Sequence, residues 1–343
     1  MKTSDIRKTS SRPRLDNKTI TKALGNYSFI LIFLAILATY LIINGGATTW
    51  NGVMNILRHS AVVGIIAFGM GIVIITGGID LSVGSMMALV GGLSVNAYNN
   101  TNSIPLTLLC ALGAGLLCGL INGVLIGRVK MPAFIVTLST MMIYRSLAQY
   151  YLRSVVGESI YSMNSTLSSY NDFFMFGNQK IMTVPMSGIM LVIIMIFFVF
   201  ISTCTKYGKS VFAVGSNVKA AKLAGISVER VHISVYAITG LLCGFSAFLW
   251  MAMQGSIDPA TAGQSYEMYA IAAVVIGGIS MSGGKGKLMG IMFGAMSYTI
   301  IDKIIASTGF DALINNTIKG CILLIAVFIQ IVIPMLRGRT KKD

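Results

Sequence analysis

Asp80 is the residue of this chain that most clearly invites a chemical role, because it borders a long stretch without charge. No Asp, Glu, Lys or Arg occurs in residues 81–127, and Asp80 itself lies in the glycine-rich run TGGIDLSVGS at 76–85. A carboxylate inside an apolar segment is costly and is by default a functional candidate. Two interpretations stay open. Asp80 or Ser82 caps the helix that follows the glycines, or Asp80 contacts a solute directly.

A second group of charged residues interrupts the apolar segments closer to the C-terminus. Arg145 lies within an apolar stretch, where it either pairs with Glu267 or Asp258, extends to the outer interface, or lines the path of a solute. Asp302 and Lys303 are neighbours near the end of a predicted helix, where we expect a solvated or mutually screened pair.

The residues that enzymes and metal sites need are absent from the sequence. The two histidines, His59 and His232, have no acidic partner at metal-ligand spacing, and no HExxH, GxSxG or CxxC motif occurs. No glycine-lysine pair has the preceding glycine of a phosphate-binding loop, so the chain does not bind ATP in that way. We therefore predict a protein that is not an enzyme, with no metal and no cofactor of its own. We also expect its cysteines to be reduced and structural: Cys110, Cys118, Cys204, Cys243 and Cys321.

A short polar segment, residues 205–230, carries the clearest local signals. Asn217 is a good N-cap, residues 218–224 form a predicted two-turn helix, and Gly225 is a good stop. The alanines at 220, 221 and 224 give this helix a small, smooth face. Two interpretations fit such a helix: it docks into the groove of a partner, or it is an amphipathic connector.

The elements that must position these residues are membrane helices. Hydrophobic residues make up 55% of the 343 residues and charged residues only 11%, which excludes a soluble enzyme, a disordered regulator and a disulfide scaffold. Because about 20 apolar residues cross the hydrocarbon core, we predict an all-α polytopic membrane protein. Its ten expected spans are 28–44, 60–77, 82–98, 105–127, 131–152, 183–204, 231–254, 268–281, 288–307 and 318–336.

The net charge of +15 is a signal of orientation, and no nucleic-acid partner is predicted. Most of the 26 Lys and Arg lie on one side of the ten spans if both termini are cytoplasmic, as the positive-inside rule requires. We expect basic cytoplasmic tails at 1–26 and 339–343, a membrane domain at 27–338, and an external loop at about 153–182. The segment 205–230 then lies inside.

Glycines at regular spacing predict close packing between helices. Gly115, Gly119, Gly123 and Gly127 lie on one helix face, and Gly290 and Gly294 repeat the four-residue step. Small residues let helix backbones approach in lipid. Residues 77–84 (GGIDLSVG) also match residues 277–284 (GGISMSGG) at five of eight positions, which suggests an internal repeat.

Three motifs in order resemble one family. The run GSNVKAAKLAGI at 215–226 resembles the coupling helix of ATP-binding-cassette (ABC) importers, and 78–85 (GIDLSVGS) looks like a signature of their ribose/galactose/xylose-type permeases. Residues 266–278 (YEMYAIAAVVIGG), followed by SGGKG at 282–286, are similar to the third motif of that family. The family usually has Leu-Asp where this chain has Met268 and Tyr269. The resemblance covers about residues 51–332.

The resemblance implies the membrane-spanning subunit of a bacterial sugar importer in the inner membrane. ATP and Mg would be bound by a separate ABC ATPase subunit, of tandem-cassette type, and an extracytoplasmic sugar-binding protein would deliver a ribose-like pentose or a hexose such as galactose. A homodimer, or a pair with a related permease, would form the pathway. The residues implied in coupling are Gly215, Asn217, Ala220, Ala221, Gly225 and Ile226. Those expected along the sugar pathway are Asp80, Ser82, Ser85, Asn122, Arg145 and Glu267.

Two other functions stay open at this point. An ion-coupled secondary sugar transporter would have the same composition, although buried carboxylates and histidines for a proton relay are few. A non-transporting membrane scaffold or a membrane-embedded enzyme is the other alternative, for which the sequence contains no reactive residues.

Overall fold

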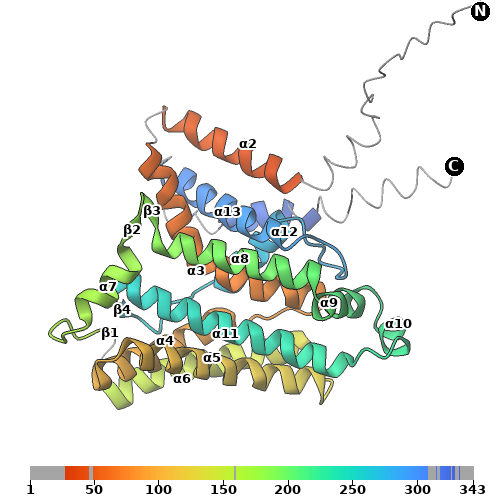
Figure 1. Ribbon diagram of the computed structural model, residues 1–343, viewed down its shortest axis with the longest axis horizontal. Coiled ribbons are helices and arrows are strands. Elements are labelled where there is room, and N and C mark those ends of the chain that lie inside the picture. The colour runs from red at the N-terminus through yellow and green to blue at the C-terminus, as the bar shows by residue number, and fades with distance from the viewer. Residues whose placement is uncertain are drawn as a thin grey trace, which may run out of the picture.

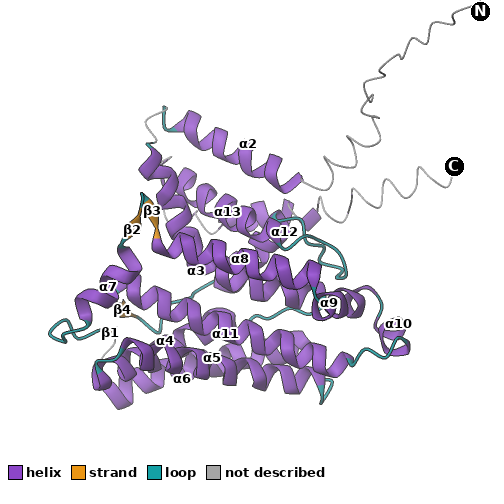
Figure 2. Ribbon diagram, viewed as in Figure 1, coloured by secondary structure: helices purple, strands orange, loops and turns teal. Residues whose placement is uncertain are grey.

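The computed structural model describes residues 28–45, 49–157, 160–307, 314, 317–325, 327–328 and 332. The described chain is overwhelmingly helical, and its strands are two residues long, so the predicted all-α fold is confirmed (Figure 2). Five of the described helices are long and apolar enough to cross a membrane, namely α3, α5, α8, α11 and α13.

The helices follow the predicted spans closely. Their bounds are α2 Ser28–Ile43, α3 Trp50–Ile75, α4 Val83–Thr101, α5 Ile104–Gly127, α6 Ala133–Tyr150, α7 Tyr170–Asn178, α8 Met186–Cys204, α9 Lys206–Ser216, α10 Val218–Leu223, α11 Val228–Gln254, α12 Tyr266–Ile276 and α13 Met289–Ser307. A π-helical turn, η1 (Tyr151–Val156), extends α6.

Two boundaries differ from the prediction by five residues or more. The second span begins at Trp50, ten residues before the predicted start, because Asn51, Arg58 and His59 are tolerated in the first turns of α3. The eighth span ends at Ile276 and not at 281, because Gly278 has a φ of +82° that ends the helix. Within the predicted tenth span, residues 317–325 are helical. The predicted tails 1–26 and 339–343 lie outside the described residues.

The long helices run roughly side by side, and the two polar loops lie at opposite ends of them (Figure 1). The short helices α9 and α10 stand at one end of the bundle. The helix α7 stands at the other end with the strands: β1 (Tyr161–Ser162) pairs antiparallel with β4 (Ser256–Ile257), and β2 (Lys180–Ile181) with β3 (Val184–Pro185). Segments 205–230 and 153–182 therefore lie at opposite ends of the bundle.

Glycine steps hold the centre of the bundle together, as predicted. Each glycine of the α5 series lies against the backbone of α11; a Cβ on Gly119, for example, would overlap the carbonyl oxygen of Tyr236. Gly290 and Gly294 of α13 contact the backbone of Gly277 and Ala273 in the same way. In lipid such close approach replaces the hydrophobic drive that packs soluble helices.

The two glycine-rich repeats both end a helix, with one residue of offset. Gly77 has a φ of +86° and Gly78 donates its N–H to the carbonyl of Val73 at 3.1 Å. Gly278 has a φ of +82°, and Ile279 donates to Val274 at 3.1 Å. Gly77 thus corresponds to Gly278, although the sequence match pairs Gly77 with Gly277. What the two segments share is therefore the backbone geometry with which each one ends its helix.

Candidate functional site

Asp80, Ser82 and Asn122 form a buried cluster where α4 begins. One carboxylate oxygen of Asp80 (Oδ1) accepts the N–H of Ser82 at 2.9 Å and its hydroxyl at 2.6 Å. Asn122, near the C-terminal end of α5, donates its side-chain N–H to the Ser82 hydroxyl at 2.8 Å. All three side chains are fully buried. The cluster therefore fixes the start of α4 against α5.

This geometry corresponds to a local turn before the helix. The Asp80 carboxylate accepts the backbone N–H of Ser82, two residues later in the chain. The Ser82 side chain makes no capping hydrogen bond within α4. The second oxygen of Asp80 (Oδ2) and the amide oxygen of Asn122 have no hydrogen-bond partner among the described residues. Ser85 is also buried, within the first turn of α4.

Arg145 and Glu267 lie in a separate place, around the loop that precedes α12. One guanidinium nitrogen of Arg145 donates to the carbonyls of Pro259 and Ala262, both at 2.7 Å. Within the described residues Arg145 forms no ion pair with Glu267 or Asp258, so the pairing expected for it is replaced by contacts with the same loop. Glu267 lies against Gly84, where a Cβ would come 3.0 Å from its carboxylate.

Five of the six residues expected along a pathway therefore fall into two groups near the first turn of α4. Ser82 is hydrogen-bonded to Asp80 and to Asn122 of α5, whereas Glu267 and the loop that Arg145 contacts lie against Gly84. Both groups are close to one helix start, although they come from α4, α5, α6 and α12.

A cavity of about 710 Å³ separates the glycine end of α3 from α10. The backbone of Thr76, Gly77 and Gly78 lines its inner side, and Tyr236 of α11 stands there with its hydroxyl 3.4 Å from the carbonyl of Ile79. Lys130, Lys222, Glu229 and His232 lie around the remainder. The cavity reaches the backbone just before Asp80, while the Asp80 side chain stays buried behind it.

The segment 205–230 contains two short helices. Asn217 caps α10 as predicted, because its side-chain oxygen accepts the N–H of Ala220 at 3.0 Å. Gly225 has a φ of +79° and follows the end of α10, also as predicted. The observed helix spans Val218–Leu223, one residue shorter than expected.

The residues expected to couple this segment to a partner do not all lie on one surface. Ala220 and Gly225 are exposed, and Leu223 is 91% exposed. Ala221 is buried against the bundle, and its carbonyl accepts the N–H of the half-buried Ile226 at 3.0 Å. Gly215 lies against the end of α3. Ala220 and Leu223 thus present a surface, while Ala221, Ile226 and Gly215 hold it in place.

One buried cation, Lys319, is not among the residues predicted from the sequence. Lys319, in the helical segment 317–325, pairs with Asp302 at 2.6 Å and lies 4.9 Å from the ring centroid of Tyr269. Asp302 is thus paired with Lys319 and not screened by Lys303, as was expected. A lysine within a predicted span was the signal that could have revealed this site. Tyr269 also contacts Tyr298, with ring centroids 4.9 Å apart.

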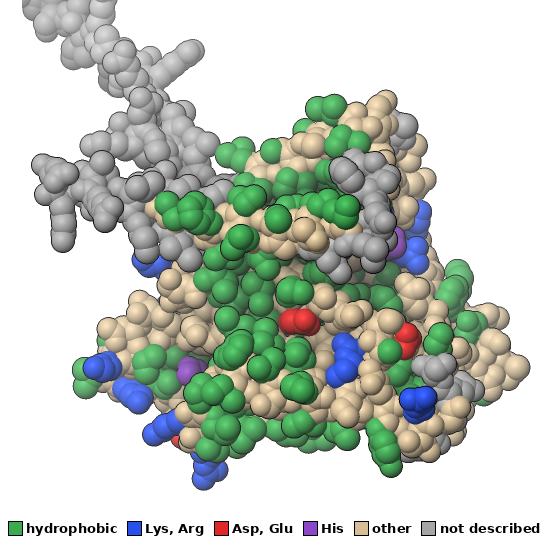
Figure 3. Space-filling model, turned by 180° about the vertical axis from the view of Figure 1, so that it is seen from behind, with side chains coloured by type: hydrophobic (Ala, Val, Ile, Leu, Met, Phe, Trp, Pro, Cys, Tyr) green, Lys and Arg blue, Asp and Glu red, His purple; other side chains and the backbone are tan. Residues whose placement is uncertain are grey.

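On the face opposite to the view of Figure 1, hydrophobic side chains gather over the middle, next to a few acidic and basic side chains (Figure 3). Basic side chains gather at the end where α9 and α10 lie. Exposed Lys and Arg residues on α9 and α10 and in the segments next to them include Lys206, Lys209, Lys219, Lys222, Arg128, Lys130 and Arg230.

Comparison with known proteins identifies the family. The family described as branched-chain amino acid transport system / permease component matches residues 52–327. The chain is 34% identical to the ribose import permease of Bacillus subtilis, over 96% of this chain and 98% of that protein. It is 36% identical to the fructose import permease of Rhizobium meliloti, over 88% of this chain and 83% of that protein.

The galactofuranose transporter permease of Escherichia coli is 33% identical, over 84% of this chain and 83% of that protein. No solved structure matches the chain significantly. The resemblance inferred from the three motifs is confirmed, and the chain belongs to this family of transport permease components together with import permeases for sugars.

Proposed function

We propose that this chain is the membrane-spanning subunit of a bacterial inner-membrane importer that moves a monosaccharide by alternating access. A separate ATPase subunit of tandem-cassette type hydrolyses ATP and carries the Mg. An extracytoplasmic sugar-binding protein delivers the sugar, and a second copy of this chain or a related permease completes the pathway. A ribose-like pentose is the favoured substrate, with a hexose such as galactose next.

The observation that carries this proposal is the surface of α10. A helix of six residues has too few contacts to be stable by itself, yet α10 is capped at Asn217, stopped at Gly225 and anchored by Ala221. Its outer side exposes Val218 and Leu223 at the basic end of the bundle. Exposed apolar side chains on a rigid, charged surface are suited to bind a partner on the cytoplasmic side.

The names of the relatives support the substrate class. Relatives that match most of the chain are permeases for ribose, fructose and galactofuranose. Polar groups at the start of α4, together with Glu267 and Arg145, are the proposed contacts for sugar hydroxyls. The unpartnered oxygens of Asp80 and Asn122 would become available if α4 moved relative to α5.

The experiment that tests the proposal uses the permease and its ATPase co-purified in nanodiscs. We expect ATPase activity to rise with one of a panel of binding proteins loaded with ribose, galactose or fructose. If no ATPase associates and labelled sugar still moves with an ion gradient, the ion-coupled alternative replaces the proposal. An ATPase that associates but responds to none of the loaded proteins would contradict a role in sugar import.

A pair of matched variants locates the ATPase contact. Leu223→Asp places a charge on the outer side of α10 and should abolish co-purification of the ATPase. Met182→Asp changes a side chain that is 92% exposed, like that of Leu223, but lies in the loop at the opposite end of the bundle. It should leave co-purification unchanged. Equal loss in both variants would contradict docking at α10.

A further inference from the structure

The carbonyl at the end of α3 is held by a loop that follows α12. Ile75 is the last residue of α3, and its carbonyl oxygen accepts the N–H of Gly284 at 2.9 Å. Ser280 donates its N–H to the carbonyl of Lys285 at 3.1 Å, which closes this loop into a tight turn. One glycine-terminated helix, α3, is therefore joined to the turn that follows the other, α12.

The turn can approach α3 and α9 this closely only because the two residues at its tip, Gly283 and Gly284, are glycines. Gly283 and Gly284 have φ values of +77° and +68°, in the left-handed region that glycine adopts without strain. A Cβ on Gly284 would come 2.7 Å from the backbone of Ser216. The tip thus contacts the last residue of α9 directly.

Gly215 of α9 completes the junction. A Cβ at this position would overlap the Ile75 carbonyl oxygen and come 2.8 Å from the N–H nitrogen of Gly284. The backbones of three segments therefore meet without an intervening side chain. Because Ser216 ends α9 and Asn217 caps α10, the junction is two residues from the coupling helix.

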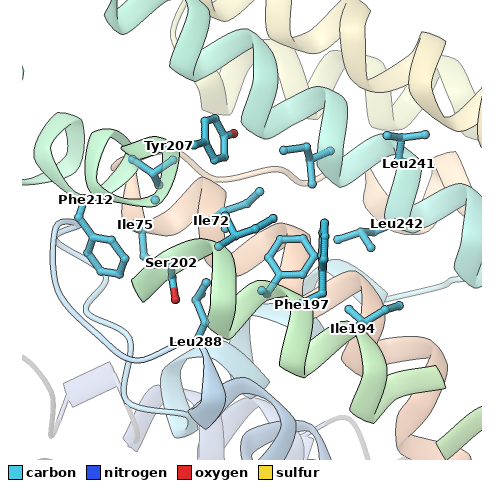
Figure 4. A pocket seen from close by; sticks show the side chains of 15 residues that line it. Ile72, Ile75, Ile194, Phe197, Ser202, Tyr207, Phe212, Leu241, Leu242 and Leu288 are labelled. Atoms are coloured by element: carbon cyan, nitrogen blue, oxygen red, sulfur yellow. The ribbon is translucent and has the colours of Figure 1, made fainter. Parts of the chain in front are cut away.

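Side-chain packing between α9 and α3 is less continuous elsewhere. An apolar pocket of about 330 Å³ lies among α3, α8, α9 and α11, and the residues that line it include Ile72 of α3, Phe197 of α8 and Phe212 of α9 (Figure 4). Side-chain contact between α9 and α3 is interrupted there. The backbone contact at Gly215 is therefore a stiffer link from α9 to α3 than the side chains beside it.

We propose that Gly215 and Gly284 are positioning residues that transmit displacement of α10 to the glycine ends of α3 and α12. This inference rests on the proposed function, since it requires an ATPase that moves α10. The end of α3 leads directly through Gly77 and Gly78 to Asp80 and the start of α4. A movement at the junction thus reaches the proposed sugar contacts through one loop. Packed interfaces convert such small shifts into discrete states.

Gly215→Ala in the complete permease–ATPase complex tests the junction. We expect the ATPase still to co-purify, because the outer side of α10 is unchanged. Sugar uptake per ATP hydrolysed should fall at least about fivefold, the lower end of the usual coupling between sites. Gly113→Ala is the control, because Gly113 is an exposed helical glycine with no neighbouring atom within 4 Å. Wild-type uptake per ATP in Gly215→Ala would overturn the inference.

A second measurement needs no change within the junction. Ser282→Cys places a thiol on the exposed turn, after the exposed Cys204 and Cys321 are replaced by serine. In inside-out vesicles holding the complex, a non-hydrolysable ATP analogue should change the rate at which a maleimide modifies this thiol. No change would overturn the inference even if Gly215→Ala fails to fold. Absence of ATPase from the wild-type complex would instead contradict the proposed function.

Discussion

Asn122 donates a hydrogen bond of 2.8 Å to the hydroxyl of Ser82, and that hydroxyl lies 2.6 Å from the Asp80 carboxylate to which it donates. The bond joins α5 to the start of α4 across the buried interior. Because Ser82 also directs its N–H at Asp80, a single carboxylate oxygen sets the direction in which α4 begins. Glu267 and Gly263, from the loop that Arg145 contacts, lie against Gly84, two residues after Ser82.

Asp80→Ala should lower the stability of the folded protein. It leaves the N–H and hydroxyl of Ser82 without their acceptor in a buried site, at a cost of about 1–3 kcal/mol. Asp80→Asn keeps a carbonyl oxygen and should retain most of the stability. The apparent melting temperatures of the two variants and of the wild type in detergent report on these differences in stability. Equal melting temperatures for wild type and Asp80→Ala would show that the cluster does not hold α4.

Arg145→Met should loosen the loop before α12, because the carbonyls of Pro259 and Ala262 lose a charged donor. Hydrogen bonds to charged groups contribute about 1.5–3 kcal/mol each, which sets the upper range for the loss. Arg145→Lys keeps a cation, so its loop should be less stable than that of the wild type but more stable than that of Arg145→Met. Limited proteolysis within 258–265 reports on the loop. A variant with wild-type proteolysis and lost uptake would instead assign Arg145 to the sugar pathway.

Gly119→Ala should destabilise the bundle, because the added methyl group overlaps the backbone of Tyr236 on α11. Overpacking of this kind typically costs about 1–3 kcal/mol. Gly113→Ala, on the same helix but exposed and without neighbours, should be neutral or stabilising by up to about 1 kcal/mol through helix propensity. Thermal aggregation followed by size-exclusion chromatography compares them. Equal behaviour would contradict the close packing of α5 on α11.

Lys319 and Asp302 should show a measurable coupling energy in a double-mutant cycle. Lys319 is buried, but the Asp302 side chain is 45% exposed, so we expect about 1 kcal/mol and not the larger value of a fully buried pair. The cycle combines Lys319→Met, Asp302→Asn and the double variant, read by thermal unfolding. Strict additivity of the single effects would show that the pair contributes nothing to stability.

Local signals in the sequence predict local structure well. Asn217 and Gly225 bound α10 as expected, because a cap and a left-handed stop depend on residues within one turn of each other. The apolar runs likewise predict the helices, since crossing a bilayer requires a length that the sequence displays directly. The glycine steps of α5 predict close contact, although the sequence does not name α11 as the partner helix.

The contacts that join distant segments depend on how the helices assemble. Nothing near Ile75 in the sequence indicates that its carbonyl accepts from Gly284 or that Gly215 lies against both. The same is true of Lys319, which pairs with Asp302 and leaves the neighbouring Lys303 out of the pair. Hydrophobic patterning specifies which face of a helix is buried but not which helix covers it. The placement of these residues therefore follows from packing between helices far apart in the chain.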